Sequence, residues 1–266
     1  MQTEELLRAG RLSEALEALE GEIRNDPTNA KLRVFLFQLL VVLGDWERAL
    51  NQLNVAAELD AMNLLMAQVC QTAISCEAFR TEIFAGKRSP LVFGEPEEWV
   101  AWLVQANQLI AEGKYAASQT LRDRAFDAAP AIPGSVDDRP FQWISDADSR
   151  FGPVLEAIVD GKYYWVPFTA IKQIRIEKPT DLRDTVWIPV QFIWTNGGEA
   201  TGLIPTRYPG SEASEDNAIR LAHKTEWIEQ PGDVYLGLGQ RMFTTDEDDF
   251  PLLQMRQIVL DHSKSD

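Results

Sequence analysis

The chain has 266 residues, of which 45% are hydrophobic and 25% charged, values that are ordinary for a globular protein and sufficient for two domains. The formal net charge is −16 and both halves of the chain are acidic, which disfavours nucleic acid and anionic membranes as partners and favours basic or neutral ones. The N-terminus has neither a basic segment nor an apolar run, and no stretch of about 18 apolar residues occurs. The sequence therefore predicts no signal peptide, no membrane span and a cytoplasmic location.

A repeated unit opens the chain. The segment 10–16 (GRLSEAL) recurs as 44–50 (GDWERAL), so that Gly10 and Gly44 lie 34 residues apart. This is the period of the tetratricopeptide repeat, a pair of packed helices, and each glycine lies where the turn between the two helices is expected. The spacing predicts a TPR-like helical region at the N-terminus.

Helical periodicity continues beyond the repeat. We expect helices over residues 3–9, 13–25, 29–43 and 64–85, and further helical segments that start near Glu97 and Gly113 and end near Ala129. Nearly every residue from Val34 to Leu43 is apolar, so that helix is expected to be buried on most sides. Cys70 and Cys76 are six residues apart and point to different helix faces, which favours buried, reduced thiols over a disulfide or a metal site.

The pattern changes after residue 129. Residues 130–140 are rich in Pro, Gly and Asp and are expected to be a linker between a helical domain (1–129) and a β-rich domain (141–266). The predicted fold class is α+β, with a mainly antiparallel sheet that curls or closes into a barrel. We expect a short helix over 153–159, a hairpin turn at Asn196-Gly197, a short helix within 211–223, and strands over 163–168, 171–177, 186–194, 200–204, 225–228, 234–238, 241–244 and 257–260.

Catalytic signatures are weak. The chain has two histidines, His223 and His262, which are too few for a histidine-rich metal site. The run Asp246–Asp249 lacks the glycine and distal glutamate of a calcium-binding loop, and Asp146 and Asp148 fit turn chemistry better than paired catalysis. We predict no catalytic residue, no cofactor and no metal. A metal-assisted hydrolase that uses these carboxylates remains the alternative.

Aromatic residues are the better candidates for recognition. The chain has eight tryptophans, most of which are expected to pack in the core. The segment 203–212 (LIPTRYPGSE) combines two prolines with Arg207 and Tyr208, and a loop of fixed shape with exposed polar groups is typical of binding sites.

Several stretches together resemble the ImpE family, also called TagJ, of bacterial type VI secretion accessory proteins. The stretches in the helical half are 32–40 (LRVFLFQLL), 44–60 (GDWERALNQLNVAAELD) and 91–99 (LVFGEPEEW). Those in the β-rich half are 146–158 (DADSRFGPVLEAI), 161–168 (GKYYWVPF), 196–212 (NGGEATGLIPTRYPGSE), 224–227 (KTEW) and 237–241 (GLGQR).

The resemblance implies a cytoplasmic protein without enzymatic activity. It implies a partner as well, the small subunit of the contractile sheath, bound through an N-terminal helix of that subunit, with an indirect link to the ATPase that recycles the sheath. A helical-repeat surface suits a helix in a groove. We expect aromatic anchors at Trp46, Trp99, Trp102 and Tyr115, with Arg207 and Tyr208 as further contacts. A scaffold that binds through the β-domain surface is the other alternative.

Overall fold

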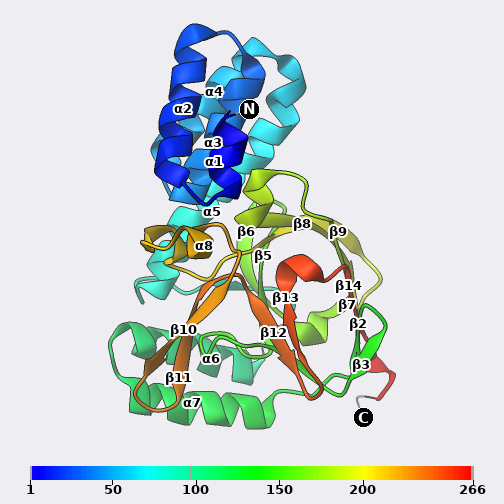
Figure 1. The fold of residues 1–266 in the computed structure, drawn as a ribbon. Coiled ribbons are helices and arrows are strands. Elements are labelled where there is room, and N and C mark those ends of the chain that lie inside the picture. The colour runs from blue at the N-terminus through cyan, green and yellow to red at the C-terminus, as the bar shows by residue number, and fades with distance from the viewer. Residues whose placement is uncertain (1, 96, 265–266) are drawn as a thin grey trace.

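The computed structural model describes residues 2–95 and 97–264. TPR-like helices form one end of the molecule and an antiparallel-rich sheet lies between them and a second helix pair (Figure 1). The α-helices are α1 (Gln2–Arg8), α2 (Leu12–Asn25), α3 (Ala30–Leu43), α4 (Trp46–Leu59), α5 (Leu64–Phe84), α6 (Glu98–Ala111), α7 (Tyr115–Ala128) and α8 (Asn217–Arg220). Short 3-10 turns are η1 (Ala61–Asn63), η2 (Phe168–Ala170), η3 (Leu182–Thr185), η4 (Ser211–Ala213), η5 (Leu252–Gln254) and η6 (His262–Lys264).

The repeat behaves as its period predicts. Gly10 and Gly44 adopt positive φ angles of 71° and 75° in the turns α1–α2 and α3–α4, a conformation that costs glycine little. Ala15 and Ala49 are fully buried where paired helices meet. Helix α3 is buried from Leu36 to Val42, as its apolar run predicts, and no described helix is both long and apolar enough to cross a bilayer.

The largest sheet of the described residues has nine strands, and its one parallel pair joins β1 and β6. Its order is β1 (Leu91–Val92), β6 (Lys162–Pro167), β5 (Val154–Val159), β9 (Glu199–Pro205), β8 (Trp187–Trp194), β7 (Ile171–Ile176), β14 (Gln257–Leu260), β2 (Gly134–Val136) and β3 (Arg139–Phe141). Smaller sheets pair β10 (Thr225–Gln230) with β11 (Val234–Gly239), and β13 (Asp249–Pro251) with β12 (Met242–Thr245) and β4 (Ile144–Asp146).

The helix expected over 153–159 is wrong, because residues 154–159 form strand β5, all of whose residues are buried. A short apolar run fits a buried strand and a buried helix equally well, and the turn that follows decides between them. Asp160 and Gly161 both have positive φ, 48° and 76°, which is the two-residue hairpin turn between β5 and β6. The hairpin expected at Asn196-Gly197 is confirmed, since β8 and β9 pair on either side of it.

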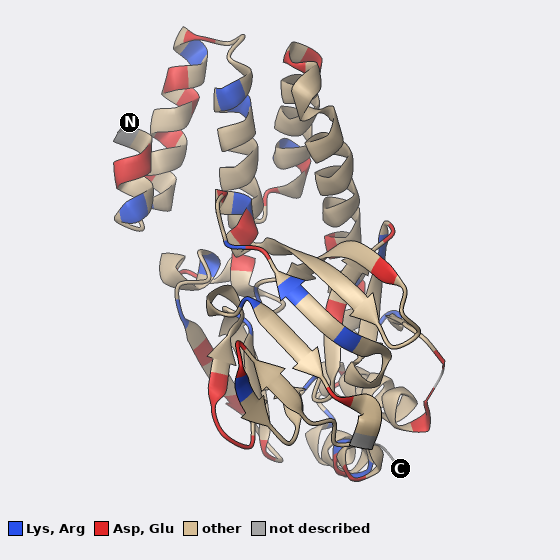
Figure 2. Ribbon diagram, turned by 90° about the vertical axis from the view of Figure 1, so that its right-hand side faces the viewer, with Lys and Arg blue, Asp and Glu red and all other residues tan. Residues whose placement is uncertain are grey.

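The helices and the sheet share a hydrophobic core. One cluster of buried side chains runs from Leu12 and Leu39 in the repeat through α5 to Trp165 and Trp187 in the sheet. Residues 130–140, expected to be a linker, supply β2 and the beginning of β3 to the large sheet. Acidic side chains are distributed over the helices and over the strands and loops (Figure 2). Cys70 and Cys76 are buried and unpaired, as predicted.

Candidate protein-binding surfaces and the buried junction

A buried ionic cluster joins α5 to the sheet. Arg80, on α5, donates to both carboxylate oxygens of Glu156 on β5, with Nε–Oε1 at 2.6 Å and Nη2–Oε2 at 2.8 Å. Arg241, between β11 and β12, pairs with the same Glu156 and with Asp146 of β4. Arg80 is 5% exposed and the other three side chains 3% or less, so the cluster lies out of reach of solvent.

The pKa values of the two carboxyl groups in this cluster are shifted in opposite directions. Burial opposes ionisation of Glu156, but the guanidinium groups of Arg80 and Arg241 outweigh it and lower the pKa of Glu156 to about 2. Burial raises the pKa of Asp146 to about 7, because Arg241 offsets only part of the desolvation and the nearby Asp148 carboxylate opposes ionisation further. The cluster thus holds one firmly ionised carboxylate and one carboxyl that titrates near neutrality.

The loop that carries Arg207 and Tyr208 is internal, although its composition suggested exposed polar groups. Arg207 is 3% exposed and donates from Nη1 to the Val42 carbonyl oxygen at 2.7 Å, within the last turn of α3. Tyr208 is fully buried and its hydroxyl donates to Asp146 Oδ1 at 2.9 Å. Burial lowers the pKa of Arg207 to about 10. In this conformation neither side chain is accessible to a partner, and their role as contacts stays a prediction.

The predicted aromatic anchors do not form one surface. Trp46 begins α4 and packs on Trp187 of β8, with ring centroids 5.8 Å apart. Trp102 and Tyr115 belong to α6 and α7, beyond the sheet from α4 (Figure 1), and both are half-buried. The guanidinium of Arg124 lies 3.8 Å from the centroid of the Trp102 ring. Trp46 therefore lies where the repeat meets the sheet, whereas Trp102 and Tyr115 lie on the second helix pair, and these anchors do not line a single groove.

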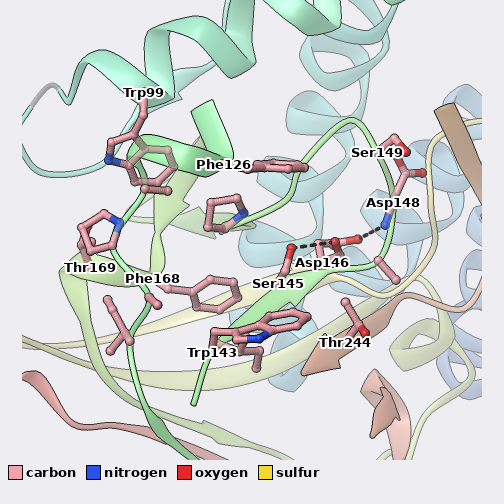
Figure 3. Close-up of a pocket in the computed structure, with 17 residues that line it drawn as sticks. Trp99, Phe126, Trp143, Ser145, Asp146, Asp148, Ser149, Phe168, Thr169 and Thr244 are labelled. Carbon is pink, nitrogen blue, oxygen red and sulfur yellow. Dashed lines mark hydrogen bonds between the residues drawn. The ribbon is translucent and has the colours of Figure 1, made fainter. Parts of the chain in front are cut away.

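Trp99 lines a cavity between the second helix pair and the strands. The cavity has a volume of about 430 Å³, and Phe126 of α7, Trp143 and Phe168 contribute further aromatic walls (Figure 3). Trp99 itself is 4% exposed, and its indole Nε1 donates to Glu97 Oε2 at 2.7 Å. The cavity suits an apolar group, and Trp99 forms part of its wall instead of an exposed anchor.

A second hollow, which we call the α5 groove, lies between α5 and the sheet. Leu65, Val69 and Thr72 line it from the helix, and Ile158 and Leu203 line it from β5 and β9. Its volume is about 600 Å³ and most of its lining is apolar. The α5 groove brings the repeat and the sheet together on one accessible surface.

The carboxylates considered as catalytic or metal-binding groups form hydrogen bonds and ion pairs within the protein. Asp148 Oδ2 accepts from Arg150 Nη2 at 2.5 Å and from the Gly237 amide at 2.6 Å. Asp246 accepts from the Gln142 amide at 2.7 Å, and Asp248 forms an ion pair with Arg139. No group of three or more His, Cys, Asp or Glu side chains in residues 2–95 and 97–264 has the arrangement of a metal site. His262, in the 3-10 turn η6, contacts the Ile171 carbonyl oxygen through Nε2 at 2.6 Å.

Comparison with known proteins finds a relative that matches nearly the whole chain. It is 51% identical over 258 residues, which are 97% of this chain and 90% of the other, to the Pseudomonas aeruginosa protein named type VI secretion system accessory component TagJ. The chain belongs to the ImpE/TagJ family. Within this family assignment, the profile described as ImpE protein matches residues 138–259, and a tetratricopeptide repeat profile matches residues 6–70.

A solved structure has the same fold as this ImpE/TagJ family member. The crystal structure of a protein from Vibrio parahaemolyticus superposes with a TM-score of 0.89 at 28% identity and covers 100% of this chain and 99% of that chain. The superposition therefore includes both the repeat and the strands, and the α+β architecture with TPR-like helices before an antiparallel-rich sheet is confirmed.

Sequence reasoning missed the α5 groove and the ionic cluster of this ImpE/TagJ protein. The groove had a signal, because no Lys or Arg occurs from Ala49 to Phe79, although a helix that faces solvent normally carries charge. The ionic cluster has no such signal in the sequence. Arg80 and Glu156 are 76 residues apart in the chain, and nothing local to either residue indicates the other.

Proposed function

We propose that this protein is an accessory component of a bacterial type VI secretion system and that it binds an N-terminal helix of the small contractile-sheath subunit. The observation that carries the proposal is the 51% identity, over nearly the full chain, to a relative named as such a component. The protein acts in the cytoplasm and without catalysis, and affects sheath assembly or turnover together with the ATPase that recycles the sheath. Its partner is a protein and neither nucleic acid nor membrane.

The geometry supports a binding role in two ways. The TPR-like helices supply a rigid scaffold of the kind that takes up helical segments. Apolar side chains also line the accessible α5 groove. Of the predicted anchors, Trp46, Trp102 and Tyr115 retain partial exposure, and their role as contacts stays a prediction. Trp99, Arg207 and Tyr208 are buried, and their role as contacts stays a prediction.

The test is titration calorimetry of the full-length protein with a synthetic peptide of the N-terminal helix of the cognate small sheath subunit. We expect a saturable isotherm with one peptide bound per protein. A peptide of the same composition with its apolar stripe scrambled is the control and should give no binding heat. If the native peptide also gives none, and fails to compete in an orthogonal fluorescence assay, the proposed function is refuted.

A further inference from the structure

The exposed side of α5 lacks charge. Along this side Leu65 is 73% exposed and Val69 45%, and Met62, just before the helix, is 89% exposed. Their exposed or half-exposed neighbours along the same side are Ala61, Gln68, Thr72 and Ser75, none of them ionisable. A solvent-facing helix normally places charged and polar residues outward, so this side has the character of a covered surface.

The position of α5 in the repeat explains what is missing. In a helical solenoid each helix packs on the one before and the one after, and the last one carries a polar outer face. Helix α5 packs on α4, but the next helix, α6, meets only its C-terminal end, where Asn107 Nδ2 donates to the Ile83 carbonyl oxygen at 3.1 Å. The N-terminal half of α5 therefore ends the stack without a following helix and without charged residues on its outer face.

The helical wall of the α5 groove is about two turns long. Leu65, Val69 and Thr72 are spaced as i, i+4 and i+7, which is one face of a helix and spans about 10 Å at a rise of about 1.5 Å per residue. Ile158 and Leu203 form the opposite wall. A mainly apolar groove with one helical wall and one strand wall accepts an amphipathic helix that inserts side chains with the same spacing.

The charges around the groove define the occupant further. Glu58 and Asp60 are exposed at the N-terminal end of α5, and Asp160 is exposed where the groove meets β5. Arg183 is the cation in the lining, and its guanidinium is already 2.9 Å from Asp181. The acidic side chains near the groove favour a basic partner, and a second copy of this chain, with net charge −16, is repelled.

We propose that the α5 groove is the docking site for an amphipathic helix of the partner, with an apolar stripe against Leu65 and Val69 and Lys or Arg residues against the acidic rim. This inference rests on the proposed function and identifies its binding surface. The bound helix continues the stack where the chain itself supplies no further helix. Its apolar stripe provides most of the binding free energy, and the basic residues speed association and select the partner.

The test uses the sheath-helix peptide and three variants of the full-length protein. Leu65→Glu and Val69→Glu place a charge in the groove at exposed positions, so both should fold as the native protein does, which circular dichroism and the melting temperature will show. Ile228→Glu is the matched control, because Ile228 on β10 is 43% exposed, close to the 45% of Val69. We expect at least tenfold weaker binding for the two groove variants and unchanged binding for the control.

The outcomes separate the two proposals. If the native protein binds the peptide and both groove variants bind it equally well, the groove assignment is overturned while the proposed function stands. If the native protein binds no peptide, the proposed function itself fails. A peptide with its Lys and Arg residues changed to Gln should bind the native protein more weakly, and equal affinity would overturn the charge complementarity.

Discussion

Replacing Arg80 with methionine removes the cation that links α5 to β5 and keeps an unbranched side chain of similar length. The guanidinium donates twice to Glu156 and once, at 2.8 Å, to the carbonyl oxygen of Arg207. Breaking a buried ion pair by removing one partner costs about 3–5 kcal/mol, because the remaining charge stays buried without compensation. Glu156 keeps Arg241 and the Tyr163 hydroxyl, so we expect the lower end, about 3 kcal/mol of unfolding free energy.

Urea unfolding followed by tryptophan fluorescence measures this loss. At an m value of about 3 kcal/mol/M, the midpoint should fall by about 1 M. Arg88→Met is the matched control, because Arg88 pairs with Glu82 at the surface, where an ion pair contributes about 0–1 kcal/mol. The double variant Arg80→Met/Glu156→Gln should lose less than the sum of the single variants, since the two groups interact directly. A loss for Arg80→Met no larger than that for Arg88→Met would refute the reasoning.

Three further predictions concern titration, packing and metal ions. The pKa of Asp146 is raised from 3.8 to about 7, so between these values the folded state binds more protons than the unfolded state, and the free energy of unfolding should fall as pH rises. Asp146→Asn should reduce this dependence of the melting temperature on pH between pH 4 and 7. In Gly237→Ala the new Cβ would lie 2.3 Å from the Tyr208 ring, which should destabilise the protein by about 1–3 kcal/mol. Gly21→Ala on α2 meets no such contact and should stabilise the protein by about 0.5–1 kcal/mol. Equal effects of the two variants in urea unfolding would contradict this. Millimolar Mg²⁺ or Ca²⁺ should leave the melting temperature unchanged, because Asp146 and Asp148 already accept bonds from arginine side chains; an upward shift would revive the hydrolase alternative.

The elements that sequence predicted well are those with a strong local period. The duplicated turns at Gly10 and Gly44, the apolar run of α3 and the alternation of β8 each follow from sequence neighbours alone. The strands β2 and β3 escaped detection because each has three residues and lies in a segment rich in Pro and Gly. Strand β5 is hard to tell from a helix, because its apolar run has no alternation and Gly161 fits a helix end as well as a hairpin turn.

The candidate site was less predictable, because exposure depends on partners far away in the chain. The segment 203–212 has the composition of a recognition loop, but Arg207 bonds to carbonyl groups of α3, more than 160 residues earlier. Trp99 has an ordinary helical environment in sequence, and α7 and the strands turn it into a cavity wall. Conversely, Leu65 and Val69 fit a buried helix by composition and are exposed because no later helix covers them.

The contact of Arg207 with α3 makes the helices and the strands depend on each other. Its Nη1 and Nη2 groups bond to the carbonyl oxygens of Val42 and Val41 in the last turn of α3. Arg80 of α5 reaches Glu156 in the opposite direction, so each half of the molecule completes polar groups of the other. A chimera that joins the helices of one relative to the strands of another is therefore expected to lose stability wherever it does not restore both contacts.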